Sequence, residues 1–304
     1  DESGMDITLT GFDEKELKDL IDWNAPTLTD PDDVPVLPKE AITQLGDFYI
    51  LGEHRLLCGD CTKKEDVDRL MNGQKAVLMA TDPPYGDSWV EKANFMQKHG
   101  YGHSHAVLHG TIKSDEKRGT DLKNFLDEFL GIALQSMEPP CPVYIWHRSQ
   151  RMIFEQVLLD AGFLVHQPVI WVKPSKFVIG RMHYHPKCEW ALHGWIPTKG
   201  GCPFYGERNQ SDVWEISREN NKIHPTQKPV ELFEIPMRNH TRQGEIAYEP
   251  FAGSGSQFIA AEKLGRKCYG LEIEPIYCDI IVKRWEQFSG KKAELVRKKV
   301  AENV

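Results

Sequence analysis

The sequence lacks the features that mark disulfide-stapled, secreted and membrane-spanning proteins. Its seven cysteines are odd in number and scattered over a chain of 304 residues, which argues against a disulfide framework. No uninterrupted apolar stretch approaches the roughly 20 residues that a membrane-spanning helix needs. The first residues contain neither the basic segment nor the apolar run of a secretory signal. We therefore expect reduced thiols, no membrane partner and a cytoplasmic location.

A surplus of basic residues is also missing from the chain as a whole, whose formal net charge is −8. The acidity is local, because residues 1–40 contain twelve Asp or Glu and three Lys, which leaves a net +1 for residues 41–304. Between Trp171 and Lys228, nine Lys or Arg outnumber five acids. This local basic surplus suits binding to phosphates, although a solvated loop can have the same composition.

The first 45 residues have linker composition. They combine acidic runs with four prolines, and only the stretch from Glu14 to Trp23 is typical of a helix. The chain also begins at Asp1 without an initiator Met. We interpret residues 1–45 as an acidic, Pro-containing linker or as the tail of a missing N-terminal domain, and expect a fragment or processed form of a longer protein.

From residue 46 onward the pattern predicts an α/β domain. A hairpin over 48–58 is followed by apolar strands near 76–80, 143–146, 164–172, 246–249 and 268–273, with helical segments between them. Strands that alternate with helices are typical of a mostly parallel sheet with helices on both faces. Residues 87–120 and 174–222 are expected to be irregular and rich in loops.

A Gly-rich loop follows one of the predicted strands and opens a helix. In the segment 248–256, Gly253 and Gly255 allow backbone N–H groups to approach a nucleotide-like ligand. Glu272 ends the next strand, where its carboxylate can accept hydrogen bonds from ribose hydroxyls. A lone Gly-x-Gly is often only a tight turn, so the loop gains its specificity from Glu272. The loop lacks the full Gly-x-Gly-x-x-Gly spacing and a Lys-Ser/Thr ending, so a dinucleotide or a triphosphate is disfavoured as its ligand.

The stretch Asp82-Pro83-Pro84-Tyr85 comes directly after an apolar strand, where open α/β sheets place their ligands. The carboxylate of Asp82 and the carbonyl of Pro83 could accept both protons of an aromatic amino group. That would localise the nitrogen lone pair for attack on a sulfonium methyl. Tyr85 could stack on a base. Two prolines alone would indicate only a stiffened turn, so these roles depend on the companion motifs.

With its companion motifs, the chain resembles the amino-methylating DNA methyltransferases of the permuted β group over residues 46–289. Gly59-Asp60-Cys61 resembles the turn that contacts the cofactor adenine, and the stretch 224–229 (HPTQKP) resembles the motif against the methionine portion of the cofactor. The catalytic motif precedes the cofactor loop, as in that group. Phage and plasmid members are often fused to a ParB-like domain, and an acidic linker like residues 1–45 joins the two.

The resemblance implies a Rossmann-like methyltransferase fold with a mostly parallel seven-stranded sheet and a circularly permuted motif order. It implies S-adenosyl-L-methionine as cofactor and no metal. The expected catalytic residues are Asp82, Pro83, Pro84 and Tyr85. The expected cofactor-binding residues are Asp60, Cys61, Asp82, His224, Thr226, Lys228, Phe251, Ala252, Gly253, Ser254, Gly255 and Glu272.

The implied substrate is double-stranded DNA, with the target base flipped out of the helix. Asp82 favours adenine N6 over cytosine N4, because family members that act on cytosine usually carry Ser there. Cytosine N4 stays open as the alternative, as does a DNA-binding module without catalysis. A protein-glutamine methyltransferase is disfavoured by the motif order. The sequence leaves open whether the protein forms a homodimer and whether a restriction enzyme accompanies it. The resemblance implies a location in the cytoplasm of a bacterial or phage-infected cell.

The implied domain plan has a catalytic domain over 46–173 and 223–289, a target-recognition region over 174–222 and a basic C-terminal tail over 290–304. The expected DNA-binding residues of the recognition region are Lys176, Arg181, Lys187, Lys199 and Arg208. A zinc site at Cys58 and Cys61 is disfavoured, because no second ligand pair lies at a usual distance. The histidines at 99, 103, 105 and 109 are more typical of a loop near DNA than of a metal site.

Overall fold

The computed structural model describes residues 29–86, 115–148, 150–174, 183–217 and 227–297. The strands are β1 (Phe48–Leu51), β2 (His54–Cys58), β3 (Leu78–Thr81), β4 (Pro142–His147), β5 (Leu164–Val172), β6 (Cys188–Trp195), β7 (Val213–Glu215), β8 (Ile246–Glu249), β9 (Lys267–Glu272) and β10 (Glu294–Val296). The helices are α2 (Lys64–Met71), α4 (Thr120–Ala133), the short 3-10 helix η2 (Leu134–Ser136), α5 (Arg151–Asp160), α6 (Glu231–His240), α7 (Ser256–Leu264) and α8 (Pro275–Ser289).

The strands form one sheet in the order β10-β1-β2-β9-β8-β3-β4-β6-β5-β7. From β2 to β5, seven neighbouring strands run parallel except β6, which is antiparallel to both β4 and β5. The predicted Rossmann-like fold with a mostly parallel sheet is thereby confirmed. The described sheet is wider than the seven expected strands, because β1 and β10 extend one edge and β7 extends the other.

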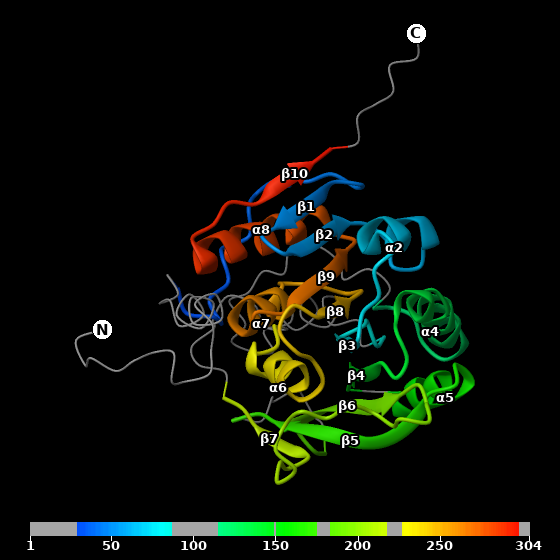
Figure 1. The fold of residues 1–304 in the computed structure, drawn as a ribbon. Helices are drawn as coiled ribbons and strands as arrows, with labels where there is room; N and C mark the ends of the chain where they lie inside the picture. The colour runs from blue at the N-terminus through cyan, green and yellow to red at the C-terminus, as the bar shows by residue number, and fades with distance from the viewer. Residues whose placement is uncertain (1–28, 87–114, 149, 175–182, 218–226, 298–304) are drawn as a thin grey trace, which may run out of the picture.

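Helices cover both faces of the sheet, as predicted. In Figure 1, α6, α7 and α8 lie on one face, whereas α2, α4 and α5 lie on the other. Each face has its own apolar core, one with Phe258 and Trp285 and the other with Phe129 and Phe154, all of them buried. Burial of aromatic side chains of this size is a large part of what stabilises such a three-layer arrangement.

The sequence did not predict β6, because residues 174–222 were interpreted as loop-rich. The strand's sequence, CEWALHGW, interrupts its apolar residues with Glu189 and His193, and both of these side chains are buried. Gly194 lies close to β5, since a Cβ atom there would sit 2.4 Å from the carbonyl oxygen of Leu164. Buried polar residues and a glycine interrupt the apolar pattern by which a buried strand is usually predicted. The strands β7 and β10 were also missed, because each has only three residues.

The described part of the N-terminal segment packs against the α/β domain. Asp32 accepts a hydrogen bond through Oδ1 from the backbone N–H of Val230 (2.9 Å), just before α6. Arg284 of α8 donates through Nη2 to the carbonyl of Pro31 (2.8 Å). Asp279 accepts the Thr43 N–H at 3.1 Å. Residues 30–43 are therefore fixed to α6 and α8 by specific contacts.

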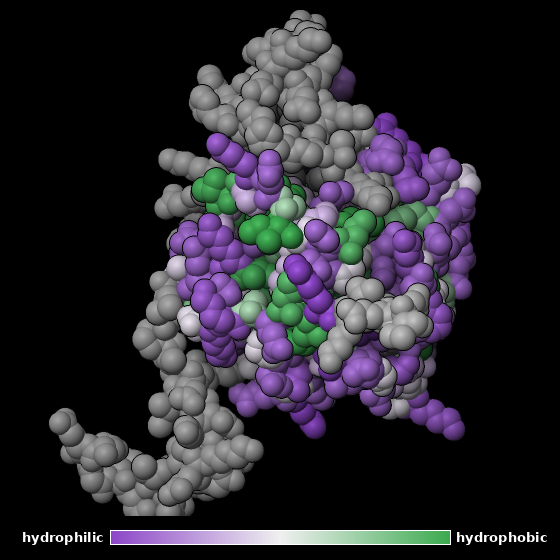
Figure 2. Space-filling view, turned by 90° about the horizontal axis from the view of Figure 1, so that it is seen from above, coloured by the Kyte–Doolittle hydropathy of each residue, from purple (hydrophilic) through white to green (hydrophobic). Residues whose placement is uncertain are grey.

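The described residues on the face seen in Figure 2 are mostly hydrophilic. Figure 2 shows hydrophobic side chains in separate patches among hydrophilic ones on the face seen from above. Among the described residues, the large apolar side chains with high exposure include Ile42 (80 %) and Val36 (70 %), both in the segment before β1. The described chain contains no helix with the length and apolar character needed to span a membrane.

Candidate active site

The catalytic motif and the Gly-rich loop leave the sheet side by side. Strand β3 pairs in parallel with β8, with Met79 opposite Tyr248. Asp82 follows the last residue of β3, and the Gly-rich loop follows β8. Because parallel strands end at the same edge of a sheet, two motifs more than 160 residues apart in the sequence meet at one edge.

Asp82 has one paired and one unpaired carboxylate oxygen. Its Oδ2 accepts a hydrogen bond from the Nζ of Lys228 at 2.6 Å. Its Oδ1 is buried, and the residues that the structure describes offer it no hydrogen-bond partner. Buried polar atoms are nearly always paired, so an orphaned acceptor at a loop of this kind indicates a place for a donor from a ligand.

The backbone after Asp82 is fixed by its neighbours. Gln150 Nε2 donates to the carbonyl of Tyr85 at 2.9 Å, and Tyr85 packs against the apolar core that contains Phe129. Gly86 has a φ of +77°, and a Cβ atom there would collide with the Lys117 carbonyl at 2.1 Å. The motif is thus held from both sides, which suits a site that must present its groups in one geometry.

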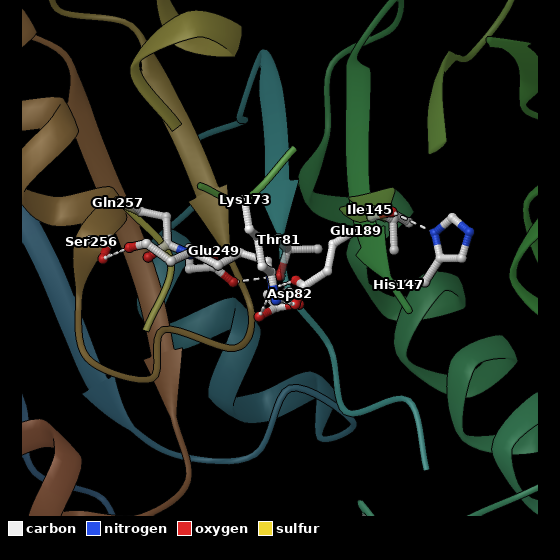
Figure 3. Close-up of polar contacts among 10 residues, drawn as sticks. Thr81, Asp82, Ile145, His147, Lys173, Glu189, Glu249, Ser256 and Gln257 are labelled. Carbon is white, nitrogen blue, oxygen red and sulfur yellow. Dashed lines mark hydrogen bonds and ion pairs between the residues drawn. The ribbon is translucent and has the colours of Figure 1, made fainter. Parts of the chain in front are cut away.

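A row of alternating charges extends from Asp82 to β6. The Lys228 ammonium also donates to Glu189 Oε2 at 3.1 Å, and the other oxygen of Glu189 accepts from Lys173, at the end of β5. Figure 3 shows Asp82, Glu189 and Lys173 converging from three different segments. Lys228 is only 5 % exposed and Glu189 only 9 %. This row of four residues is called the charge row below.

The charge row sets the ionisation of its members. Burial raises the pKa of Asp82 against the opposing effect of Lys228. Burial also disfavours the Glu189 carboxylate, but Lys228 and Lys173 outweigh it and lower the pKa of Glu189 to about 2. Burial disfavours the Lys228 ammonium as well, yet Asp82 and Glu189 outweigh it and raise its pKa. At neutral pH, Lys228 and Glu189 are therefore both charged.

The Gly-rich loop and the expected ribose acid are in direct contact. Glu272 Oε2 accepts the N–H of Gly253 at 2.7 Å, and Oε1 accepts the N–H of Glu274 at 2.9 Å. Gly253 has a φ of +53°, in the left-handed region that favours glycine. Burial raises the pKa of Glu272 to about 7, although its backbone hydrogen bonds lower it. A carboxylate has about four acceptor sites, so Glu272 keeps capacity for a hydrogen bond from a ligand.

The turn with Asp60 lies beside Glu272. Cys58 of β2 is in register with Glu272 of β9, and the Gly59 N–H donates to the Glu272 carbonyl at 3.0 Å. Asp60 Oδ1 accepts the N–H and hydroxyl of Thr62. The Cys61 thiol is buried, and its pKa is raised by burial, so this thiol is not a nucleophile.

Another buried carboxylate, that of Glu249, links the two loops. Its oxygens accept the Thr81 hydroxyl, the Phe251 N–H at 2.8 Å and the Gln257 amide. The pKa of Glu249 is raised to about 8, chiefly by burial and in part by the charge of Asp82, while its hydrogen bonds oppose the rise. Thr81 and Phe251 adjoin Asp82 and the Gly-rich loop, so Glu249 fixes the two motifs relative to each other.

Further contacts tie the Gly-rich loop to its surroundings. The Ser256 hydroxyl donates to the Lys228 carbonyl at 2.8 Å, and Arg284 Nη1 donates to the Ser254 carbonyl at 2.9 Å. A Cβ atom at Gly255 would lie 3.0 Å from Ile281, so this glycine is needed for packing against α8. Phe251 contacts Phe129 edge-on, and Ala252 is buried. The loop is therefore preformed.

Some expected site residues lie apart from this cluster or outside the described structure. His224, Thr226, Lys176 and Arg181 lie outside the described residues, as do the histidines at 99–109. Lys187, Lys199 and Arg208 are exposed. Lys173 belongs by sequence to the basic stretch, yet it pairs with Glu189 in the site. Glu189 could not be found from local sequence pattern, because only the fold brings β6 to Lys228.

Taken together, the sheet and its two loops define a Rossmann-like methyltransferase domain. The profile of a DNA methylase family matches residues 77–283, and the profile of a ParB-methyltransferase HTH domain matches residues 1–45. The type II methyltransferase M2.DpnII of Streptococcus pneumoniae is 36 % identical over 236 residues, which cover 71 % of this chain and 84 % of that protein. The chain therefore belongs to this DNA methylase family.

Solved structures share the fold. The M1.HpyAVI–SAM complex has a TM-score of 0.53 at 23 % identity and covers 75 % of this chain and 98 % of its own. PvuII DNA methyltransferase, described as cytosine-N4-specific, has a TM-score of 0.56 at 14 % identity and covers 79 % of this chain and 94 % of its own. The expectation of a DNA methyltransferase with S-adenosyl-L-methionine as methyl donor is confirmed at the level of the family.

Proposed function

We propose that the chain transfers a methyl group from S-adenosyl-L-methionine to the N6 amino group of adenine in DNA, and that it is a permuted β-group enzyme. The observation that carries the proposal is the buried Asp82 Oδ1, an acceptor without a partner in the described structure at the edge where β3 and β8 end. The alternative within the same chemistry is cytosine N4, which the same acceptors would also suit.

The chain's own groups would activate the amino nitrogen. Asp82 Oδ1 would accept one amino proton and the Pro83 carbonyl the other, which localises the lone pair that the ring otherwise delocalises. When bound, S-adenosyl-L-methionine supplies an electrophilic sulfonium methyl. Asp82 would hold the surplus proton after transfer. Pro84 keeps the loop rigid, and Tyr85 would stack on the flipped base, an interaction worth about 1–3 kcal/mol.

The cofactor would lie along the Gly-rich loop. Glu272 would accept the ribose hydroxyls through its remaining lone pairs, while Gly253 lets the backbone approach closely. Asp60 and Cys61, beside Glu272, would border the adenine ring. The other assigned residues are Phe251, Ala252, Ser254 and Gly255 in the loop, and His224, Thr226 and Lys228 in the motif before α6.

The assignment of Lys228 is refined by its contacts. Its ammonium binds Asp82 and Glu189, so its main task would be at the catalytic carboxylate, whereas its carbonyl receives the Ser256 hydroxyl at the start of α7. It thus links the catalytic loop to the cofactor loop. We likewise assign Asp82 both to the catalytic residues and to the cofactor-binding residues.

The target DNA would be bound beside the connections that flank β6. Lys187, Lys199 and Arg208 are exposed there, and Lys176 and Arg181 belong to the same stretch of sequence. We assign residues 174–222 to target recognition, with the qualification that β6 within them belongs to the catalytic sheet. The catalytic domain then comprises 46–173 and 223–289, followed by the basic segment 290–304.

Residues 1–45 would belong to a ParB-like DNA-binding part. The HTH-domain match of residues 1–45 and the contacts of residues 30–43 with α6 and α8 support a DNA-binding part attached to the methyltransferase. A homodimer on duplex DNA and a partner restriction enzyme are compatible with this assignment, in a bacterial or phage-infected cytoplasm.

The identity of the methylated base is tested by nucleoside mass spectrometry of DNA that has been treated with the protein and the cofactor. N6-methyladenine is the expected product, because Asp82 heads the catalytic motif. N4-methylcytosine without N6-methyladenine would make the protein a cytosine enzyme. Methylation of a protein but not of DNA, or cofactor binding without any transfer, would contradict the proposal outright.

A further inference from the structure

We propose that Glu189 is a positioning residue of this reaction, which shares the Lys228 ammonium with Asp82 and so leaves Asp82 able to bind the target amino group strongly. The inference deepens the proposed function and rests on it. Glu189 lies on β6, outside every motif that the sequence analysis assigned to catalysis or cofactor binding.

The geometry carries the inference. Lys228 Nζ lies 2.6 Å from Asp82 Oδ2 and 3.1 Å from Glu189 Oε2, so one ammonium bridges two carboxylates. The second oxygen of Glu189 is bound by Lys173. Charged groups this deeply buried are costly unless they are paired and hydrogen-bonded. The charge row satisfies that condition by alternating two acids with two bases, whose formal charges sum to zero.

The consequence for Asp82 is electrostatic. If Glu189 were uncharged, Lys228 would have Asp82 as its one anionic partner within the charge row, and two positive charges would face a single carboxylate. Asp82 would then be a weaker base and a weaker acceptor for an amino proton. Glu189 therefore offsets part of the electrostatic effect of Lys228 on Asp82, and its ion pair also keeps the Lys228 ammonium in place.

The groups that act on Asp82 come from several elements, and their signs are known. Lys228, before α6, and Lys173, after β5, both lower its pKa. Glu189 on β6 raises it. Glu249 on β8 is coupled to Asp82 through charge repulsion. Removal of the Glu189 charge should thus shift the pKa of Asp82 downward, and removal of the Lys173 charge should shift it upward.

The test is the pH profile of single-turnover methyl transfer to one DNA duplex, with cofactor affinity measured by calorimetry. In Glu189→Gln we expect the plateau rate to fall about tenfold and the acid midpoint to move down by about half a pH unit or more. In Lys173→Met the midpoint should move up. The double variant should return toward the wild-type midpoint, because the remaining pair, Asp82 and Lys228, is again neutral.

Glu234→Gln is the matched control. Glu234 is also a buried carboxylate that binds two cations, Arg238 and Lys263, but it lies on α6 away from the charge row. It should lower thermal stability without moving the acid midpoint. The double variant also guards against a single variant that fails to fold, since it removes both members of one ion pair.

The outcomes separate this inference from the proposed function. An unchanged rate and midpoint in Glu189→Gln would overturn the role of Glu189. A lower rate with unmoved midpoints in both single variants would mean that Glu189 only supports the fold, which also overturns it. If the wild-type protein methylates no DNA, or if Asp82→Asn remains fully active, the proposed function fails before Glu189 is tested.

Discussion

Glu272 shows how one side chain can serve both the loop and the ligand. Its two oxygens already accept N–H groups from Gly253 and Glu274, so the loop conformation and the carboxylate depend on each other. Because the carboxylate is buried and its pKa is raised to about 7, a ligand that donates hydrogen bonds should favour its ionised form.

Glu272→Ala should weaken binding of S-adenosyl-L-methionine by about tenfold to a hundredfold, because hydrogen bonds to a charged group are each worth about 1.5–3 kcal/mol. Calorimetric titration measures the change. Glu274→Ala is the control, since it keeps the backbone N–H that Glu272 accepts, and its affinity should stay within about threefold of the wild type. Wild-type affinity in Glu272→Ala would remove Glu272 from the cofactor site.

Single residues also show what sequence can and cannot predict. Asp82, Gly253 and Glu272 were predictable because each stands at the end of an apolar strand, where local pattern and chemistry coincide. Glu189 and Lys173 were not, because their roles arise from contacts between β5, β6 and the turn before α6. Such contacts leave no trace in local spacing.

Helices and strands, like single residues, were predictable where the local sequence pattern determines them. Strands such as β3 and β8 are short apolar runs with turn signals at their ends, and the helices between them have clear apolar faces, so their order and the parallel sheet were predictable. Strand β6 has Glu189 and His193 buried within it, and the edge strand β7 has only three residues. Tertiary packing, rather than local propensity, creates these strands.

The N-terminal strap, residues 30–34, is an element that bears on the site from outside the sheet. Asp32 accepts the Val230 N–H two residues after Lys228, and the Asp32 carbonyl accepts the Gln227 amide. Arg284 joins the Pro31 carbonyl to the Ser254 carbonyl of the Gly-rich loop. The strap thus supports both the charge row and the cofactor loop.

Asp32→Ala should destabilise the protein by about 1 kcal/mol, as loss of a hydrogen bond between a side chain and the backbone typically does. Denaturant unfolding measures this, and cofactor affinity should fall with it. Asp33→Ala is the matched control, because Asp33 is exposed and adjacent. Equal stability of the two variants would mean that the strap does not support α6.

The whole molecule should respond to pH through its buried titratable groups. Glu249 has a pKa of about 8 in the folded protein, raised from 4.5 by burial. The folded state therefore holds this proton more tightly than the unfolded state, and stability is lost as pH rises from about 4.5 toward 8. His147 acts oppositely, because burial lowers its pKa to about 4 and stability is lost as pH falls below about 6.5.

Glu249→Gln should remove part of the stability loss that occurs as pH rises. Relative to the wild type, its free energy of unfolding should improve between pH 5 and pH 8, by on the order of 1–3 kcal/mol. Urea unfolding at several pH values measures this. Asp68→Asn, which alters only an exposed pair with Lys64, should leave the pH dependence unchanged. A parallel pH profile for Glu249→Gln would show that this carboxyl is ionised when buried.

The central claim is that Asp82 accepts an amino proton of a base in DNA. Its most direct test compares wild type and Asp82→Asn in single-turnover transfer of a labelled methyl group to duplex DNA, with the product identified by nucleoside mass spectrometry. Asp82→Asn should be slower by at least about a thousandfold, with cofactor affinity within about threefold of the wild type, and the wild-type product should be N6-methyladenine. Transfer by Asp82→Asn at the wild-type rate would contradict the account.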